Sequence, residues 1–175
     1  LRITERYRRT DFGHIELARP VFHIQFLPIV LKILKCFCLR CSKLLLDKNS
    51  VDVAEIIKSY KGKKRFTEIV ERCTKQSGMK ICGVESDDGC GAVQPSKYVK
   101  KELSKIFAEW KDKSLEGVDA ENTQLLTAEF IQKIFRRISD EDCDAIGLSP
   151  KWCRPDWLIC SVLPVSPPSV RPSVK

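Results

Sequence analysis

The sequence has no long apolar run. Its most hydrophobic stretch, "PVFHIQFLPIVLKIL" (residues 20–34), is too short to cross a bilayer and is interrupted by His23, Gln25, Pro28 and Lys32. We therefore expect no membrane span. Apolar residues make up 43% and charged residues 31% of the chain, which is typical of a globular domain rather than a disordered one.

Histidine and glycine are scarce. His14 and His23 are the only two histidines, and both lie in a hydrophobic N-terminal segment, where we expect hydrogen-bonded core residues rather than catalytic bases. The "GCG" at 89–91 lacks the spacing and the Lys-Ser/Thr ending of a phosphate-binding loop. These absences argue against a nucleophilic triad and a nucleotide-binding loop.

Methionine occurs once, at Met79, and the chain begins with Leu1. We interpret the sequence as a fragment or an incomplete gene model, whose start says nothing about targeting. The opening "LRITERYRRT" is Arg-rich as transit peptides are, but Glu5 and Asp11 argue against that interpretation.

Positive charge predominates. The net charge is +8 and the pI is about 9.1, which favours an acidic partner, with nucleic acid as the first candidate. A basic surface that only keeps the protein in solution is the alternative. The densest basic groups are Lys63, Lys64 and Arg65, together with Arg136 and Arg137. A solvated face and a phosphate contact both remain open for them.

Nine cysteines occur, an odd number without regular spacing or a secretory signal, which favours a reduced intracellular compartment over a disulfide scaffold. "CLRC" places Cys38 and Cys41 in a Cys-x2-Cys knuckle, in which two thiolates can bind one ion. Cys82 and Cys90 lie on a Gly-containing loop that could supply two more, and four thiolates suit zinc. Buried free cysteines are the alternative, and the residues alone leave both open.

Hydrophobic spacing predicts several helices. They cover residues 28–36, two helices within 52–75 joined at Gly62, residues 127–138 with Phe130 in the apolar stripe, and a short acidic helix capped by Ser139. Residues 158–165 favour a β-strand, and residues 77–96 and 114–124 are predicted connectors. The Pro-rich segment 164–175 should be extended and unable to continue a sheet or helix.

Several motifs together resemble the N-terminal clamp region of the largest subunit of eukaryotic RNA polymerase II. They are "FGHIELARPVFHIQF", "CLRCSKLLLDK", "GCGAVQP", "FRRISDEDCDAIGLSPKWCRPDWLICSVLPV" and "PPSVRPSV", in this order. The resemblance runs from about Phe12 to the C-terminus. It divides the chain into residues 1–11, expected to be a non-native start, a clamp-core fragment at 12–163, and the Pro-rich segment 164–175.

The resemblance implies one structural zinc site made by Cys38, Cys41, Cys82 and Cys90. The remaining five cysteines then have no metal role: Cys36, Cys73, Cys143, Cys153 and Cys160. The family's earlier zinc site would end in a histidine at position 11, where this chain has Asp11, and residues 1–10 contain no cysteine. That first site is therefore expected to be missing here.

The resemblance also bears on residues 98–111, "YVKKELSKIFAEWK". The spacing of Val99, Leu103, Ile106 and Phe107 predicts a helix. The family has a β-hairpin after "QP", which here would turn near residues 101–102. We adopt the hairpin. The expected fold class is then α+β: a clamp-core fragment with several helices, short strands and zinc-binding loops.

The resemblance implies that the chain takes part in DNA-templated transcription in the nucleus. The fragment would help to hold nucleic acid in the cleft of the polymerase, a nucleotidyltransferase, beside other subunits, especially the second-largest, and the DNA template and RNA–DNA hybrid. Magnesium would belong only to the complete enzyme, since the family's catalytic Asn-Ala-Asp-Phe-Asp-Gly-Asp string does not occur in this sequence. The alternatives are a free-standing zinc-binding nucleic-acid module and a non-functional truncated product.

Overall fold

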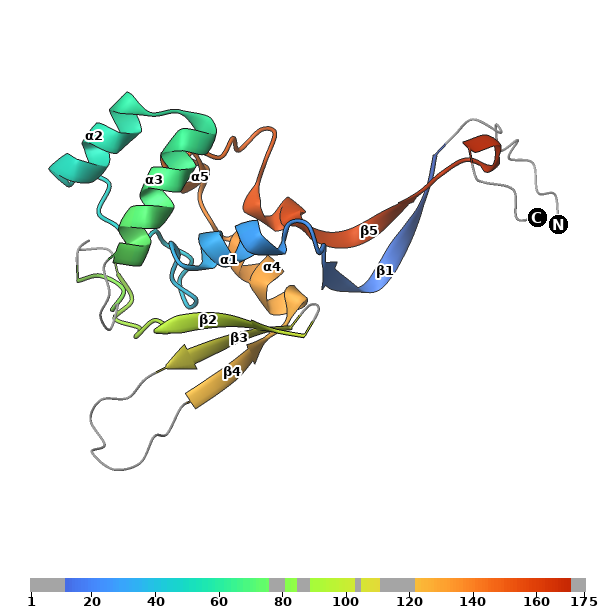
Figure 1. Cartoon of the computed structure of the whole chain (residues 1–175), viewed down its shortest axis with the longest axis horizontal. Coiled ribbons are helices and arrows are strands. Elements are labelled where there is room, and N and C mark those ends of the chain that lie inside the picture. The colour runs from blue at the N-terminus through green and yellow to red at the C-terminus, as the bar shows by residue number, and fades with distance from the viewer. Residues whose placement is uncertain (1–11, 76–80, 85–88, 103–104, 111–121, 171–175) are drawn as a thin grey trace.

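The computed structural model describes residues 12–75, 81–84, 89–102, 105–110 and 122–170. Within these ranges it contains helices and two small antiparallel sheets, which confirms the α+β class. The helices gather on one side of the molecule, and a two-stranded ribbon projects from the other (Figure 1).

The helices follow the spacing of the apolar residues. Their bounds are α1 Leu27–Leu34, α2 Val51–Ser59, α3 Gly62–Lys75, α4 Ala128–Arg136 and α5 Asp140–Ala145. Gly62 has φ +54° where α2 gives way to α3, as its predicted role at this junction requires. Thr127 and Ser139 accept hydrogen bonds from the backbone N–H groups of Phe130 and Asp142. The predicted helices and the Ser139 cap are confirmed.

The projecting ribbon consists of β1 Gly13–Phe22 and β5 Ile159–Val165, paired antiparallel with a register shift between Glu16 and Val21. Strand β5 confirms the predicted strand, whereas β1 was not predicted. His14 is exposed on β1 and His23 is half-buried after it, so the expectation that both are core residues is wrong. The segment lies on the ribbon rather than in the core.

The Pro-rich end is more ordered than expected. Pro164 and Val165 belong to β5, and a short 3-10 helix, η2 Pro168–Val170, follows. The expectation that proline excludes a sheet here is therefore wrong for these residues. A two-stranded ribbon has only edge strands, and at an edge a proline can lack its N–H without breaking a ladder.

The second sheet has the order β2-β3-β4, with β2 Lys97–Lys101, β3 Lys105–Trp110 and β4 Asn122–Leu126. Strands β2 and β3 pair with Lys101 opposite Lys105, and Glu102 has φ +56° at the turn. The hairpin is confirmed, and the helix that periodicity favours is wrong. Residues 122–124, predicted as connector, belong to β4, and residues 114–121 lie outside the described ranges.

The core lies where α1, α3, α4 and the inner face of the second sheet meet. Ile33, Ile69, Ile106, Ile131 and Phe135 are all fully buried within it. A 3-10 helix, η1 Pro155–Leu158, closes the core ahead of β5 and also buries Leu158. Phe130, expected in the α4 stripe, is instead 37% exposed.

Candidate metal centre

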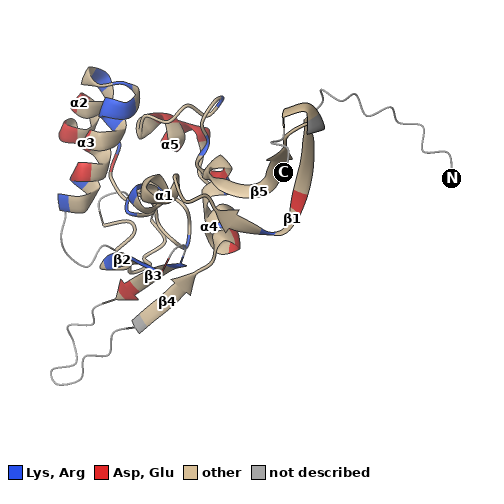
Figure 2. Ribbon diagram, turned by 45° about the vertical axis from the view of Figure 1, so that its right-hand side comes forward, with Lys and Arg blue, Asp and Glu red and all other residues tan. Residues whose placement is uncertain are grey.

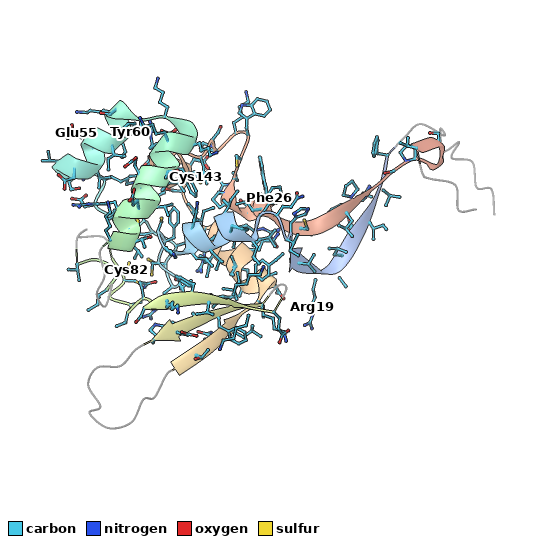
Figure 3. All side chains as sticks on the ribbon, in the orientation of Figure 1. Arg19, Phe26, Glu55, Tyr60, Cys82 and Cys143 are labelled. Atoms are coloured by element: carbon cyan, nitrogen blue, oxygen red, sulfur yellow. The ribbon has the colours of Figure 1, made fainter. Side chains whose placement is uncertain are left out.

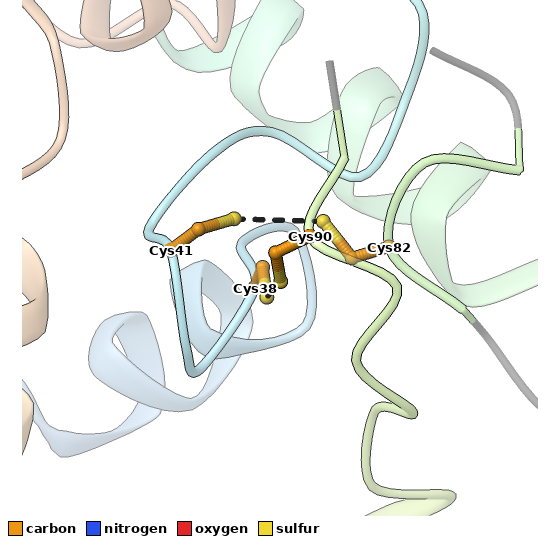
Figure 4. Close-up of side chains that lie close together, drawn as sticks. All are labelled: Cys38, Cys41, Cys82 and Cys90. Atoms are coloured by element: carbon orange, nitrogen blue, oxygen red, sulfur yellow. Dashed lines mark hydrogen bonds between the residues drawn. The ribbon is translucent and has the colours of Figure 1, made fainter. Parts of the chain in front are cut away.

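Four cysteines from two distant loops lie side by side. The Sγ atoms of Cys38, Cys41, Cys82 and Cys90 are all within 4.8 Å of one another (Figure 4). The Sγ atoms of Cys38 and Cys90 are 3.6 Å apart, and those of Cys41 and Cys82 are 3.5 Å apart. All four are free thiols, at separations far beyond a disulfide bond. The structure thus brings together the four predicted ligands.

The first loop is a tight hairpin that follows α1. The backbone N–H of Cys38 donates to the carbonyl of Lys43 at 2.9 Å, and that of Leu45 donates to the carbonyl of Cys36 at 2.8 Å. Ser42, directly after Cys41, turns the chain with φ +63°. Because the hairpin closes in so few residues, the thiols of Cys38 and Cys41 face the same point.

The second loop has the same construction. The N–H of Cys82 donates to the carbonyl of Ala92, and the N–H of Gly91 donates back to the carbonyl of Cys82. Gly83 has φ +98°, and a Cβ added to it would lie 2.6 Å from the Cα of Gly89. Glycine at position 83 therefore allows the loop to close and bring Cys90 back beside Cys82.

Backbone N–H groups point at the sulfur atoms. The N–H of Arg40 donates to the Sγ of Cys38 at 3.3 Å, and the backbone of Lys43 and of Ala92 bonds to the thiols of Cys41 and Cys90. Each of these donors lies two residues after its cysteine. Such bonds favour the anionic thiolate, which is the form that binds metal.

The thiols differ in acidity. Burial raises the pKa of Cys82 to about 12. Burial also acts to raise the pKa of Cys90, but hydrogen bonds from the backbone of Ala92 and from the other three thiols lower it to about 7. The pKa of Cys90 thus lies below that of an ordinary cysteine, whereas burial raises the pKa of Cys41 and Cys82, so that these two thiols hold their protons more tightly. A cation that occupies the cluster must displace those protons.

The donor set fits a tetrahedral ion. Sulfur atoms that each lie 2.3 Å from one zinc are about 3.8 Å apart. The two shorter separations, 3.6 and 3.5 Å, are close to that edge. The cluster could hold a metal ion with small side-chain adjustments, and four sulfur donors suit a borderline-soft ion.

Sequence reasoning missed one polar residue at the cluster. Gln94 is 3% exposed, and its Nε2 donates to the Sγ of Cys38 at 3.1 Å. It lies inside the quoted "GCGAVQP" motif, but nothing in its spacing indicates a partner 56 residues earlier in the chain. The one local signal in the sequence is a glutamine directly after a cysteine-bearing loop.

The other cysteines lie outside the cluster. Cys36, Cys73 and Cys143 are fully buried. The thiol of Cys36 donates to the carbonyl of Lys32, and both Cys36 and Cys73 belong to the hydrophobic core. Figure 3 shows Cys143, in α5, well apart from Cys82. Cys153 and Cys160 are half-buried elsewhere.

Residues 5–175 match the family described as "RNA polymerase Rpb1, domain 1". The chain belongs to this family. Its members are largest subunits of the DNA-directed RNA polymerase, a nucleotidyltransferase that works in transcription as an assembly of subunits with nucleic acid. The match includes part of segment 1–11. Among the described residues, no helix of this Rpb1-family chain is long and apolar enough to cross a membrane.

The residues of this Rpb1-family chain that we predicted to contact nucleic acid differ in their exposure to solvent. Lys63 and Lys64 are exposed at the start of α3, and Arg136 and Arg137 are exposed at the end of α4. Figure 2 marks Lys and Arg positions in blue along α2 and α3, interspersed with Asp and Glu positions in red. Arg65 is only 9% exposed and donates to three backbone carbonyls, so its prediction as a nucleic-acid contact is not retained.

Proposed function

We propose that this chain is the clamp region of the largest subunit of a eukaryotic RNA polymerase II and acts in the nucleus. The family match and the order of the quoted motifs support this, with "RPDW" followed by "VLPV" as the most specific part. In the structure these motifs connect α5 to the ribbon: Arg154 donates to Asp140 and to the carbonyl of Ile138, and η1 then leads into β5.

We propose that Cys38, Cys41, Cys82 and Cys90 hold one structural zinc. The observation that carries this is the approach of their four sulfur atoms to within 4.8 Å from two separate hairpins. When bound, zinc would supply a link between these hairpins. Cys41 and Cys82 are 41 residues apart, so closing this loop without a link costs chain entropy.

The exposed basic residues support a part in holding nucleic acid. Lys63, Lys64, Arg136 and Arg137 would contact backbone phosphates of the DNA template or of the RNA–DNA hybrid, without reading sequence. The second-largest subunit is the partner proposed to complete the cleft, and magnesium chemistry is assigned to the complete enzyme. The net charge of +8 favours this role.

Metal analysis tests the central claim. The full 175-residue chain, purified under reducing conditions, should carry one equivalent of zinc. It should still bind one equivalent when refolded with zinc in the presence of excess magnesium. A refolded chain that binds no thiophilic metal would contradict the zinc site. Sub-micromolar, sequence-selective DNA binding at physiological salt would instead favour a free-standing nucleic-acid module.

A further inference from the structure

The side chain of Gln94 makes three hydrogen bonds at the metal centre. Its Nε2 donates to the Sγ of Cys38 at 3.1 Å and to the carbonyl of Ala92 at 2.9 Å, and its Oε1 accepts from the backbone N–H of Leu39 at 3.0 Å. An amide nitrogen has two protons, so both donors are used. With 3% exposure, water cannot replace these bonds.

The partners fix the orientation of this amide. If the amide were flipped, its NH2 group would face the N–H of Leu39, and its oxygen would face the carbonyl of Ala92. Both contacts would be repulsive, which rules out the flip. The backbone groups of Leu39 and Ala92 therefore fix the amide in the orientation in which its Nε2 donates to the Sγ of Cys38.

This arrangement connects the two cysteine hairpins without a metal. Gln94 follows the second hairpin, whereas Cys38 and Leu39 belong to the first, 56 and 55 residues earlier. We propose that Gln94 is a positioning residue of the metal centre, which aligns the two hairpins and orients the Sγ of Cys38 for the ion. This inference rests on the metal site proposed above.

The chemistry of the bond agrees with this role. Four thiolates around a divalent ion leave a net charge of −2, and N–H donors to sulfur disperse it. Cys38 accepts from Gln94 as well as from the backbone of Arg40. A carboxylate at position 94 has nearly the same shape, but it would place another negative charge against the sulfur.

Release of zinc to a chromophoric chelator tests the proposal on the full chain. Gln94→Glu should release zinc about 10–100-fold faster than the wild type, the range usual for partners that orient a metal ligand. Gln94→Leu, which removes the bonds without adding charge, should lie in between. Gln124→Glu is the matched control, since Gln124 is exposed on β4 and makes the same change of charge. It should release zinc at the wild-type rate.

A measurement on the wild type covers the case in which both variants fail to fold. In an NMR spectrum with nitrogen-15 label, the side-chain NH2 signals of Gln94 should shift on zinc addition and exchange slowly with water, unlike those of Gln124. Wild-type release rates for both Gln94 variants, or NH2 signals that zinc does not move, would overturn the inference. A wild type that binds no zinc at all would instead overturn the proposed metal site.

Discussion

The guanidinium of Arg65 donates to the carbonyl oxygen of Asp144, 79 residues further along the chain, at 2.8 Å. It also donates to the carbonyls of Tyr60 and Ile57. One side chain thus joins α2, α3 and α5. Beside it, Gly147 at φ +87° has no room for a side chain, because a Cβ there would lie 2.6 Å from the carbonyl oxygen of Gly62.

We expect Arg65→Ala to lower the free energy of unfolding by about 3 kcal/mol, because three partly buried backbone carbonyls lose a charged donor. Urea unfolding with saturating zinc measures this. Lys64→Ala is the control: Lys64 is exposed, its ammonium lies over the Tyr60 ring, and its removal should cost less than about 1 kcal/mol. Equal losses for the two variants would contradict the assignment.

Arg65 also shows what sequence patterns cannot reveal. "KKR" at 63–65 is a run of like residues, yet two are exposed and the third is buried. Helical spacing places position 65 on the face of Ile69. A buried guanidinium is tolerable there because backbone carbonyls at the end of α2 and in α5 accept from it, and the carboxylate of Asp144 lies 3.7 Å away. Partners so distant in the chain leave no local signal.

The hairpin at residues 97–110 presents the same difficulty. Ile106 is fully buried and Phe107 is partly buried, so apolar neighbours imitate a helical stripe. Their strand conformation depends on pairing with β4, which the sequence did not reveal. Helices with a continuous buried stripe, such as α3 and α4, were predictable because their stabilising signals are local, and α4 also has the Thr127 cap. The residues alone indicated the four cysteines as a candidate metal site but left buried free thiols open, and the family resemblance decided between the two.

Ser42 is strained, and its replacement should stabilise the chain. It has φ +63°, and its buried hydroxyl has no hydrogen-bond partner among the described residues. Ser42→Gly should raise the free energy of unfolding by about 1 kcal/mol in saturating zinc. Ser59→Gly, the same exchange at the last residue of α2, should bring no such gain, because Ser59 does not have a positive φ. A loss of stability in Ser42→Gly would show that the serine is required.

The purified chain should not synthesise RNA. The aspartate motif that holds catalytic magnesium in the family is absent from this sequence. Labelled UTP should therefore not be incorporated on a DNA template beyond the level of a preparation that lacks the chain. Template-dependent incorporation that co-elutes with the chain, free of host polymerase, would contradict this expectation.

DNA binding by the isolated chain should be weak and sensitive to salt. A cleft wall contacts backbone phosphates, and few contacts persist without the partner subunits. Each phosphate contact contributes about 0.9 to the slope of log K against log salt. Replacing Lys63 and Lys64 with alanine should lower this slope by up to about 2 units. Replacing the exposed Lys43 beside the metal loop is the control. An unchanged slope in the double variant would remove Lys63 and Lys64 from the proposed interface.

Replacing a clustered cysteine and replacing a core cysteine should have different effects on zinc binding. Cys82→Ser should lose the metal, because the Sγ of Cys82 lies 3.5 Å from that of Cys41 within the cluster. Cys36→Ser and Cys73→Ser should keep one equivalent of zinc, because both thiols pack in the hydrophobic core. They should lose only stability, by about 1–2 kcal/mol for a hydroxyl buried in place of a thiol.

A chelator should reproduce the effect of Cys82→Ser on the fold. Structural zinc contributes on the order of 10 kcal/mol of binding free energy, which becomes folding free energy when the site forms only in the folded chain. Zinc removal should therefore loosen the wild type and the Cys36→Ser variant alike, and zinc addition should restore both. It should leave the already metal-free Cys82→Ser chain unchanged. If Cys36→Ser or Cys73→Ser is the variant that loses its metal, the assignment of the four ligands is wrong.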